Sequence, residues 1–285
     1  MEGNKKQFKL RWYILGTLGL LVLAFFCWDI FKPVPTVGDW QTPLAVLSTA
    51  EFNGDLVTVK NVRNFQYDEA ENVTKADYYD RTYDLNKIVK VWYLVEPFKG
   101  LKIAAHTFVS FEFSDGNFLS ITIEARKLKG QEYNLFYGLF HTYPLMYIAA
   151  DERDSVFVRT NIRKDDLYVY PVKLAKAENA RLLLVDMLNK MNNLIVHPYW
   201  YNTLWANCTS NIVYHVNHVS QNRLPQVPWQ AWLTGYADEL AYKMGLLDVN
   251  STLEEARKKY YVTKRSQEFG YVANYSQFIR QFPAD

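Results

Sequence analysis

The chain has 285 residues, enough for one large domain or two small ones with a sizeable core. Its net charge is only +2, so charge gives no support to nucleic-acid binding. Aromatic residues make up 16% of the chain, which suits a β-rich body, a groove for apolar ligands or a surface against a membrane. The sequence has no internal repeat, zinc-type cysteine spacing or phosphate-binding glycine loop.

The N-terminus combines a basic tail with an apolar run. Residues 1–11 carry four basic side chains, and residues 12–28 carry no charge. A run of this length is at the short end of those that span a bilayer as a helix. Since basic flanks stay inside, we expect a single-pass anchor with the body facing outward, which in a bacterium means the cytoplasmic (inner) membrane and a body in the periplasm. The alternatives are a cleaved signal peptide or a lipoprotein site at Cys27, but no small-x-small cleavage site follows and Phe26 precedes the cysteine.

Residues 29–40 contain two prolines and a glycine and are predicted to form a tether, which leaves residues 41–285 as one periplasmic domain. Its first half is rich in strand patterns. We expect a hairpin around Asn53–Gly54 and a second one turning at Asp115–Gly116. Further strands are predicted in residues 86–98, and one or two in residues 154–173.

Helical periodicity dominates the second half. Apolar residues recur at spacings of three and four in residues 177–194 and again in 207–220. A third helix is predicted in residues 229–247, ending near Gly245, and the tail is expected to hold a short helix and loops. The fold class is therefore α+β, with an antiparallel sheet packed by helices.

Cys208 is the only cysteine outside the apolar run and has no intramolecular partner there. An odd cysteine in an exported body indicates an intermolecular bond or a free reactive thiol, with a buried inert thiol as the structural alternative. Its predicted position at the start of a helix favours a thiolate. His106 and Glu124 are expected side by side on the two strands of one hairpin. If the helix packs on the sheet, the three form a nucleophile, a base and a group that orients the base.

Spacing leaves other interpretations open, since His106 also fits a structural role and Glu124 also fits a pair with Arg126. His215 and His218 are two and three helical turns from Cys208, too far to touch the thiol. His197, before a proline, is an alternative base. With His141, these histidines offer no set of three at useful metal-binding spacing, so neither a metal nor another cofactor is predicted.

Several segments resemble the Lnb N-terminal periplasmic domain family. They occur in the family's order over most of residues 58–280 and read KNVRNFQYDEAEN, YYDRTYDLNKIVKVWYLVEPF, AHTFVSFEF, ITIEARK, ADERDSVFVRTN, DDLYVYPV and YNTLWANCTSNI. The family is named after a bacterial lipoprotein N-acyltransferase whose periplasmic domain precedes a membrane domain. The order of histidine strand, polar strand and cysteine helix is also similar to permuted papain-like folds, which include NlpC peptidases and lecithin:retinol acyltransferase.

The resemblance implies Cys208 as nucleophile, His106 as base and Glu124 as the third member. Thr122 stands where the family pattern has serine. Asn207 is expected to cap the cysteine helix, and the Cys208 backbone N–H to help hold an oxyanion.

Charged residues of other family-like motifs allow two interpretations. A buried salt-bridge network between sheet and helices is one, and contact with a substrate phosphate group is the other. The residues are Arg126, Glu152, Arg153 and Arg159.

The resemblance thus implies a thiol acyltransferase or acyl hydrolase that uses a cysteine thioester on phospholipid or lipoprotein acyl groups. No second membrane span is apparent after residue 35, so a separate membrane-protein partner is an open possibility. Two alternatives remain: a cell-wall peptide amidase or peptidase of the NlpC type, and a non-catalytic membrane-anchored ectodomain.

Overall fold

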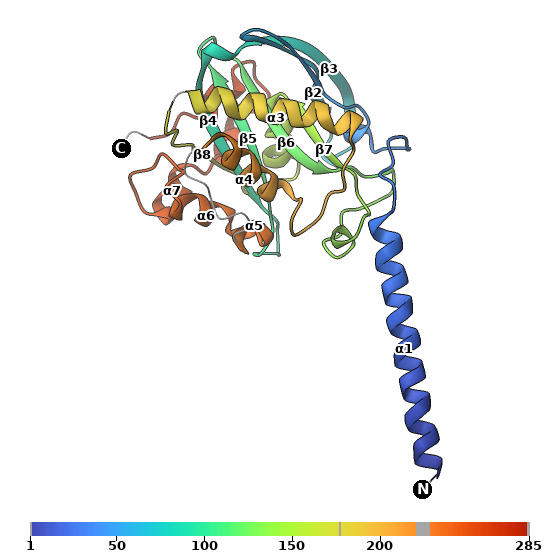
Figure 1. The fold of residues 1–285 in the computed structure, drawn as a ribbon. Helices are drawn as coiled ribbons and strands as arrows, with labels where there is room; N and C mark the ends of the chain where they lie inside the picture. The colour runs from blue at the N-terminus through green and yellow to red at the C-terminus, as the bar shows by residue number, and fades with distance from the viewer. Residues whose placement is uncertain (1, 177, 221–228, 284–285) are drawn as a thin grey trace.

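A mostly antiparallel eight-stranded sheet forms the centre of the computed structural model, which describes residues 2–176, 178–220 and 229–283 (Figure 1). The strand order is β1-β2-β7-β6-β5-β4-β8, and β3 also pairs with β2. Among the described strands, only β2 and β7 run parallel, meeting at Arg63 and Ala150. The strands are β1 (Thr49–Asn53), β2 (Leu56–Tyr67), β3 (Val73–Asp84), β4 (Ile88–Pro97), β5 (Ala105–Phe113), β6 (Phe118–Ala125), β7 (Leu145–Ala150) and β8 (Tyr168–Pro171).

Helices cover both faces of the sheet. The long helix α3 and the cysteine helix α4 lie on one face, as Figure 1 shows, and α2, η4, α8 and α9 meet the other. The α-helices are α1 (Glu2–Ile30), α2 (Glu152–Ser155), α3 (Glu178–Val196), α4 (Cys208–Val219), α5 (Trp229–Trp232), α6 (Ala237–Lys243), α7 (Leu253–Lys259), α8 (Thr263–Phe269) and α9 (Tyr275–Phe278). Short turns of other helix types are η1 (Thr42–Leu44), η2 (Leu85–Lys87), η3 (Tyr137–Leu139), η4 (Val158–Ile162, a π-helix) and η5 (Thr234–Tyr236).

The alternation of side chains along β4 explains why the sheet is covered twice. Val91, Tyr93 and Val95 point into the core beneath α3 and α4. Trp92 and Leu94 point into a second core against the C-terminal helices. Each such large apolar side chain contributes roughly 1.5–3 kcal/mol when it leaves water, so both layers stabilise the central strands.

The predicted α+β class and both predicted hairpins are confirmed. β1 and β2 turn at Gly54, whose φ of +61° favours glycine, and β5 and β6 turn at Gly116 with a φ of +82°. The strand predicted in residues 86–98 and the helices predicted in 177–194 and 207–220 correspond to β4, α3 and α4.

Of the one or two strands predicted in residues 154–173, the structure contains one, β8. The first half of the segment lies in α2 and the π-helical turn η4 instead. Asp151 caps α2 by accepting a hydrogen bond from the Arg153 backbone N–H. This cap starts a helix immediately before the β-branched residues of the segment. Strands β3 and β7 were not predicted. In β7 every residue is buried, so it lacks the alternation that marks a half-exposed strand.

The single helix predicted in residues 229–247 is also wrong, because the segment divides into α5, η5 and α6. The interruption lies at Gly235, where a Cβ atom would be 2.1 Å from the Lys102 carbonyl oxygen. The Gly235 N–H instead bonds the Ile103 carbonyl. Close backbone packing therefore overrides the helical pattern. The predicted end near Gly245 holds, with a φ of +65° there.

Helix α1 leaves the body as a separate rod (Figure 1). Its stretch Lys9–Ile30 is, within the described part of the chain, the one helix long and apolar enough to cross a membrane. The helix end is fixed to the body through Asp29, which accepts hydrogen bonds from the His141 backbone at 3.2 and 3.4 Å. Lys32 donates to the His141 carbonyl at 2.8 Å, and Trp200 donates to the Lys32 carbonyl.

Candidate active site

His106 and Glu124 lie side by side on neighbouring strands, as predicted. Strands β5 and β6 pair with Phe108 opposite Thr122, and His106 and Glu124 each lie two residues beyond this pair. The His106 Nε2 atom is 3.2 Å from a Glu124 carboxylate oxygen. Hairpin geometry thus accounts for the pair, because the tight turn at Gly116 sets the register.

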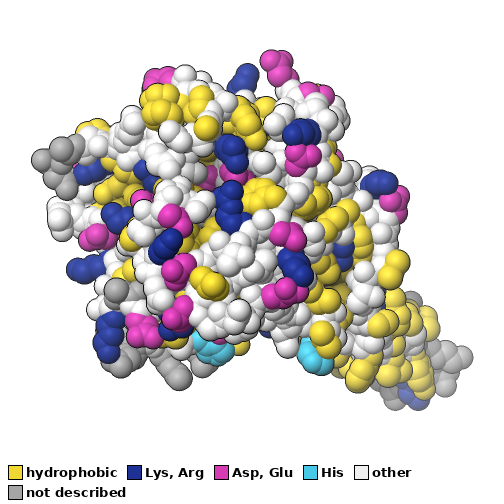
Figure 2. Space-filling model, turned by 90° about the horizontal axis from the view of Figure 1, so that it is seen from above, with side chains coloured by type: hydrophobic (Ala, Val, Ile, Leu, Met, Phe, Trp, Pro, Cys, Tyr) yellow, Lys and Arg dark blue, Asp and Glu magenta, His cyan; other side chains and the backbone are white. Residues whose placement is uncertain are grey.

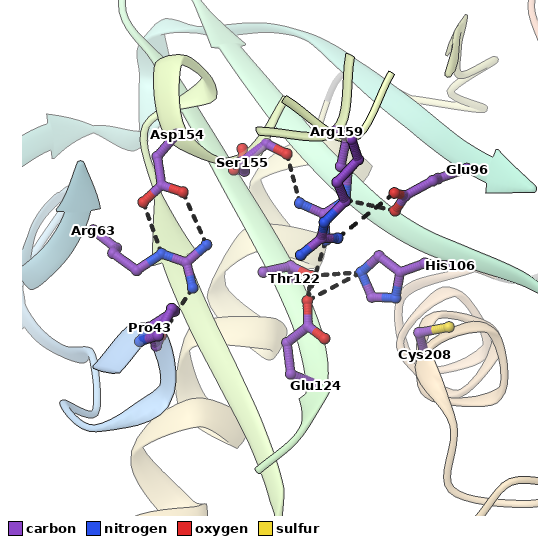
Figure 3. A network of polar contacts seen from close by, with 12 residues as sticks. Pro43, Arg63, Glu96, His106, Thr122, Glu124, Asp154, Ser155, Arg159 and Cys208 are labelled. Carbon is purple, nitrogen blue, oxygen red and sulfur yellow. Dashed lines mark hydrogen bonds and ion pairs between the residues drawn. The ribbon is translucent and has the colours of Figure 1, made fainter. Parts of the chain in front are cut away.

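Thr122 links the two side chains. Its hydroxyl donates to Glu124 at 2.7 Å and lies 2.7 Å from His106 Nε2. Because a hydroxyl has one hydrogen to donate, Thr122 accepts the second bond, so Nε2 carries a proton. The threonine thus performs the bridging role at the position where the family pattern has serine. The second ring nitrogen, Nδ1, lies on the Cys208 side of the ring (Figure 3).

Cys208 is the first residue of α4, and its position follows from the local sequence. The Asn207 side chain accepts from the Ser210 N–H at 2.8 Å, and the Ser210 hydroxyl accepts from the Asn207 N–H, a reciprocal capping box. The predicted cap is therefore confirmed. Asn207 also donates to the Thr203 and Ala231 carbonyls, which holds the helix start against two loops.

Packing of α4 on β5 brings the thiol to the imidazole. The Thr107 and Thr209 hydroxyls are 2.9 Å apart, and the Cys208 Sγ lies 3.9 Å from the Ala105 carbonyl. Both Cys208 and His106 are buried, at 3% and 8% exposure. Cys208 therefore lies next to His106 although the two residues are roughly 100 positions apart in the chain (Figure 3).

The electrostatics favour a charged pair. Burial disfavours the imidazolium, but the Glu124 carboxylate and Cys208 outweigh this and raise the pKa of His106 to about 10. Burial also opposes the thiolate, yet the His106 hydrogen bond and charge bring the pKa of Cys208 below its usual value. The pKa of Glu124 is held well below its ordinary range, because His106 and Arg159 outweigh its burial.

Arg159 and Glu96 complete the cluster. Arg159 Nε is 2.6 Å from Glu96, and its Nη2 is 3.3 Å from Glu124. The π-helical turn η4 presents this arginine, which also bonds the Ser155 carbonyl (Figure 3). Glu96 lies opposite His106 on β4. It was not singled out from the sequence, although a lone carboxylate in an otherwise apolar strand end was a usable signal.

Two predicted arginines lie outside this cluster. Arg126 donates to the Leu44 and Ala45 carbonyls and stacks on Trp40 at 4.3 Å. Arg153 pairs with Asp151 at 2.8 Å. Their contact with a substrate stays a prediction.

A buried ion pair joins Glu152 to Arg280, and a second one joins Asp154 to Arg63. A salt-bridge network of the predicted kind is thus present, though with partners that the sequence did not indicate.

Two pockets meet at His106. The first, of about 240 Å³, leads to Cys208 and is lined mainly by apolar side chains. The second, of about 750 Å³, is more polar and includes Glu124, with five basic and three acidic side chains in its lining. The residues shared by both are Phe98, His106, Tyr133 and Tyr201. The imidazole therefore stands between an apolar and a polar compartment.

The remaining histidines have other partners. His215 Nδ1 lies 2.6 Å from Asp186 and its Nε2 lies 2.8 Å from the Tyr147 hydroxyl, while His218 is 3.3 Å from Asp186. His141 contacts Asp29 at the base of α1. His197, the alternative base, follows the end of α3 and does not line the Cys208 pocket. Among the residues that the structure describes, no group of three His, Cys, Asp or Glu side chains is arranged to hold a metal ion.

Comparison with known proteins supports the resemblance seen in the motifs. The sequence model of the Lnb N-terminal periplasmic domain family matches residues 74–235, more than half of the 285 residues. Neither the curated proteins nor the solved structures gave a match. The family and the single apolar helix fit a single-pass membrane protein with a periplasmic body. The chain therefore belongs to the Lnb N-terminal periplasmic domain family.

Proposed function

We propose that this protein is a cysteine-dependent acyltransferase or acyl hydrolase that acts on phospholipid or lipoprotein acyl groups through a thioester on Cys208. The observation that carries the proposal is the placement of a buried thiol at a helix start, beside a histidine that a carboxylate orients. Nucleophile, base and orienting group are the three parts that covalent acyl transfer requires. A permuted papain-like core, as found in NlpC-type enzymes, agrees with the order of the histidine strand, the glutamate strand and the cysteine helix.

The proposed reaction begins with attack of the Cys208 thiolate on the carbonyl carbon of an ester. The C–S bond forms while the carbonyl electrons move to oxygen, and the oxyanion lies near the α4 N-terminus, where the Cys208 N–H and the helix dipole stabilise it. Collapse breaks the bond to the leaving alcohol, which takes the proton from the His106 imidazolium. An amine, a hydroxyl or water then attacks the thioester, His106 accepts its proton, and the thiolate returns.

The two pockets suggest how a lipid ester would lie. An acyl chain fits the apolar pocket beside Cys208, and the polar leaving group fits the compartment around Glu124. Arg159 holds Glu124 ionised and is itself paired with Glu96, so its proposed role is to position the carboxylate. A wall peptide would place polar groups against the apolar lining at Cys208, which makes a cell-wall amidase the weaker candidate.

The proposal includes the location of the chain. Residues 12–28 would anchor the body at the outer face of the cytoplasmic membrane, with 29–40 joining it to the domain from residue 41 onward. The proposed partner is a separate membrane protein that works with this domain.

The test is the intact mass of the full-length protein after incubation with diacyl phospholipid micelles. We expect an acyl adduct that hydroxylamine removes, present in Cys27→Ser and absent in Cys208→Ser. The first variant controls for the other, exposed cysteine. Absence of any adduct, together with a Cys208 thiol that alkylating agents modify only after unfolding, would contradict the enzymatic proposal. A reactive thiol that forms adducts only with wall peptides would support the amidase instead.

A further inference from the structure

Exposed apolar side chains surround the mouth of the Cys208 pocket. Three separate segments supply them: the β4–β5 turn, the loop before and within η3, and the end of α5 with the residue after it. We call these five side chains the rim: Phe98, Ile103, Phe136, Trp232 and Leu233. Their exposure ranges from 36% for Phe98 to 62% for Phe136. Such a group of exposed apolar residues from distant segments marks an interaction surface.

The rim lies at the end of the body from which α1 departs. In Figure 1 the β4–β5 turn, α5 and the η3 loop all point to the side toward which α1 runs. The opposite end is different: seen from above in Figure 2, acidic and basic side chains are spread over the surface among apolar ones. The body therefore has an apolar pocket mouth on the anchor side and a face of mixed charged and apolar side chains on the other.

Aromatic contacts connect the rim directly to the apolar helix. Phe136 packs edge-on against Phe140 with ring centres 5.4 Å apart. Phe140 in turn contacts Phe25 and Phe26 of α1 at 5.7 and 6.4 Å. Phe25 precedes the end of the apolar stretch at Ile30 by five residues, which is roughly 7.5 Å along a helix. The η3 loop thus reaches the depth of residues that lie within the apolar stretch.

We propose that the rim inserts into the lipid interface, so that the Cys208 pocket opens toward the membrane leaflet. Aromatic residues such as Trp232 prefer this region, because one part of the ring is apolar and another can bond water or headgroups. The five side chains then line the entrance of an apolar passage from the lipid to the thiol. Insertion of the rim stands independently of the chemistry, whereas its use as an entrance for acyl chains rests on the proposed function.

Depth-dependent fluorescence quenching tests the insertion. The full-length chain with Cys27→Ser and Cys208→Ser is reconstituted in phosphatidylcholine nanodiscs, and one new cysteine is labelled with bimane. The rim positions are Ile103→Cys, Phe136→Cys and Trp232→Cys, each tested separately. Lipids brominated in the upper part of the acyl chain serve as quenchers.

The matched control is Val89→Cys, an exposed apolar position at the other end of β4 from Phe98. Nine residues of strand separate the two, roughly 30 Å. We expect brominated lipid to reduce the rim signals at least twofold relative to unbrominated lipid and to leave the Val89 label unchanged. Circular dichroism identifies any variant that misfolds, and the other two rim positions then decide. Rim labels that stay as bright as the control would overturn the proposal, whatever the thioester assay shows.

Discussion

Two buried histidines contact carboxylates in this protein, and their environments differ. His106, near the start of the interior strand β5, has Glu124 on one ring nitrogen and Cys208 on the other side, and its pKa rises to about 10. His215, on α4 itself, has Asp186 and Tyr147 as partners, yet burial outweighs Asp186 and lowers its pKa. The difference teaches that a carboxylate contact does not by itself keep a buried imidazole charged. The other groups around the ring decide.

The difference has a chemical meaning. His106 can be charged at neutral pH beside a thiol, which suits proton transfer in acyl chemistry. His215 is neutral under the same conditions and joins α3, α4 and β7 through hydrogen bonds, a structural role. Each of the following changes tests one side of this comparison.

The largest expected effect is on turnover. His106→Ala should slow thioester formation about 1000-fold, because the thiolate loses its counter-ion and the leaving alcohol loses its proton donor. His215→Ala should stay within severalfold of the wild type. Time-resolved intact mass gives both rates, and circular dichroism checks the fold. Equal losses in the two variants would remove the distinction between the histidines.

Stability should show the opposite order. His215→Ala deletes a fully buried ring and leaves the Tyr147 hydroxyl and Asp186 without this partner, so we expect a loss of about 2–4 kcal/mol in the free energy of unfolding. Urea unfolding followed by fluorescence measures it. His218→Ala, on the exposed side of the same helix, is the control and should change the midpoint little. An unchanged midpoint in His215→Ala would refute the structural role.

Glu124→Gln should reduce thioester formation by about 10- to 100-fold. The carboxylate raises the pKa of His106, so its removal lowers that pKa. The imidazolium is needed to protonate the leaving alcohol, and the alkaline limb of the pH–rate profile, near 10 in the wild type, should therefore move to lower pH. A rate loss without any shift of this limb would indicate that Glu124 acts on the geometry alone.

The last prediction concerns stability against pH, where the two histidines have opposite signs. The pKa of folded His106 is raised above its unfolded value, so its stabilisation is complete below about 6.5 and is lost as pH rises toward 10. The pKa of folded His215 is lowered, so the unfolded chain binds more protons and stability falls as pH drops below about 6.5. Urea midpoints of the wild type and of His106→Gln and His215→Asn, from pH 5 to 9, measure these slopes. Parallel curves for all three proteins would contradict both assignments.

Much of the site could be predicted because it depends on local patterns. The turn at Gly116 sets the β5–β6 register, and that register alone puts His106 beside Glu124. The capping residue Asn207 and the apolar spacing after it start a helix at Cys208. Only the contact between hairpin and helix required more than these patterns, and there the family resemblance supplied the expectation.

Other parts of the site could not be predicted from local patterns. Arg159 was expected in a salt-bridge network, but its partner Glu96 depends on how η4 packs against β4. The pairing of Glu152 with Arg280 joins α2 to the end of the chain, across more than 120 residues. Such pairs depend on the packing of whole elements, and no periodicity in the sequence records them.

The sequence by itself determined the apolar segment 12–28, the α+β class, the two hairpins and the helices α3 and α4, because turn residues, caps and apolar spacing act within a few residues of one another. The tertiary structure alone decided the insertion of β7 beside β2, the interruption at Gly235 and the charge state favoured at each histidine. These features arise from burial and from groups distant in the chain, which exist only once the sheet and its helices have packed together.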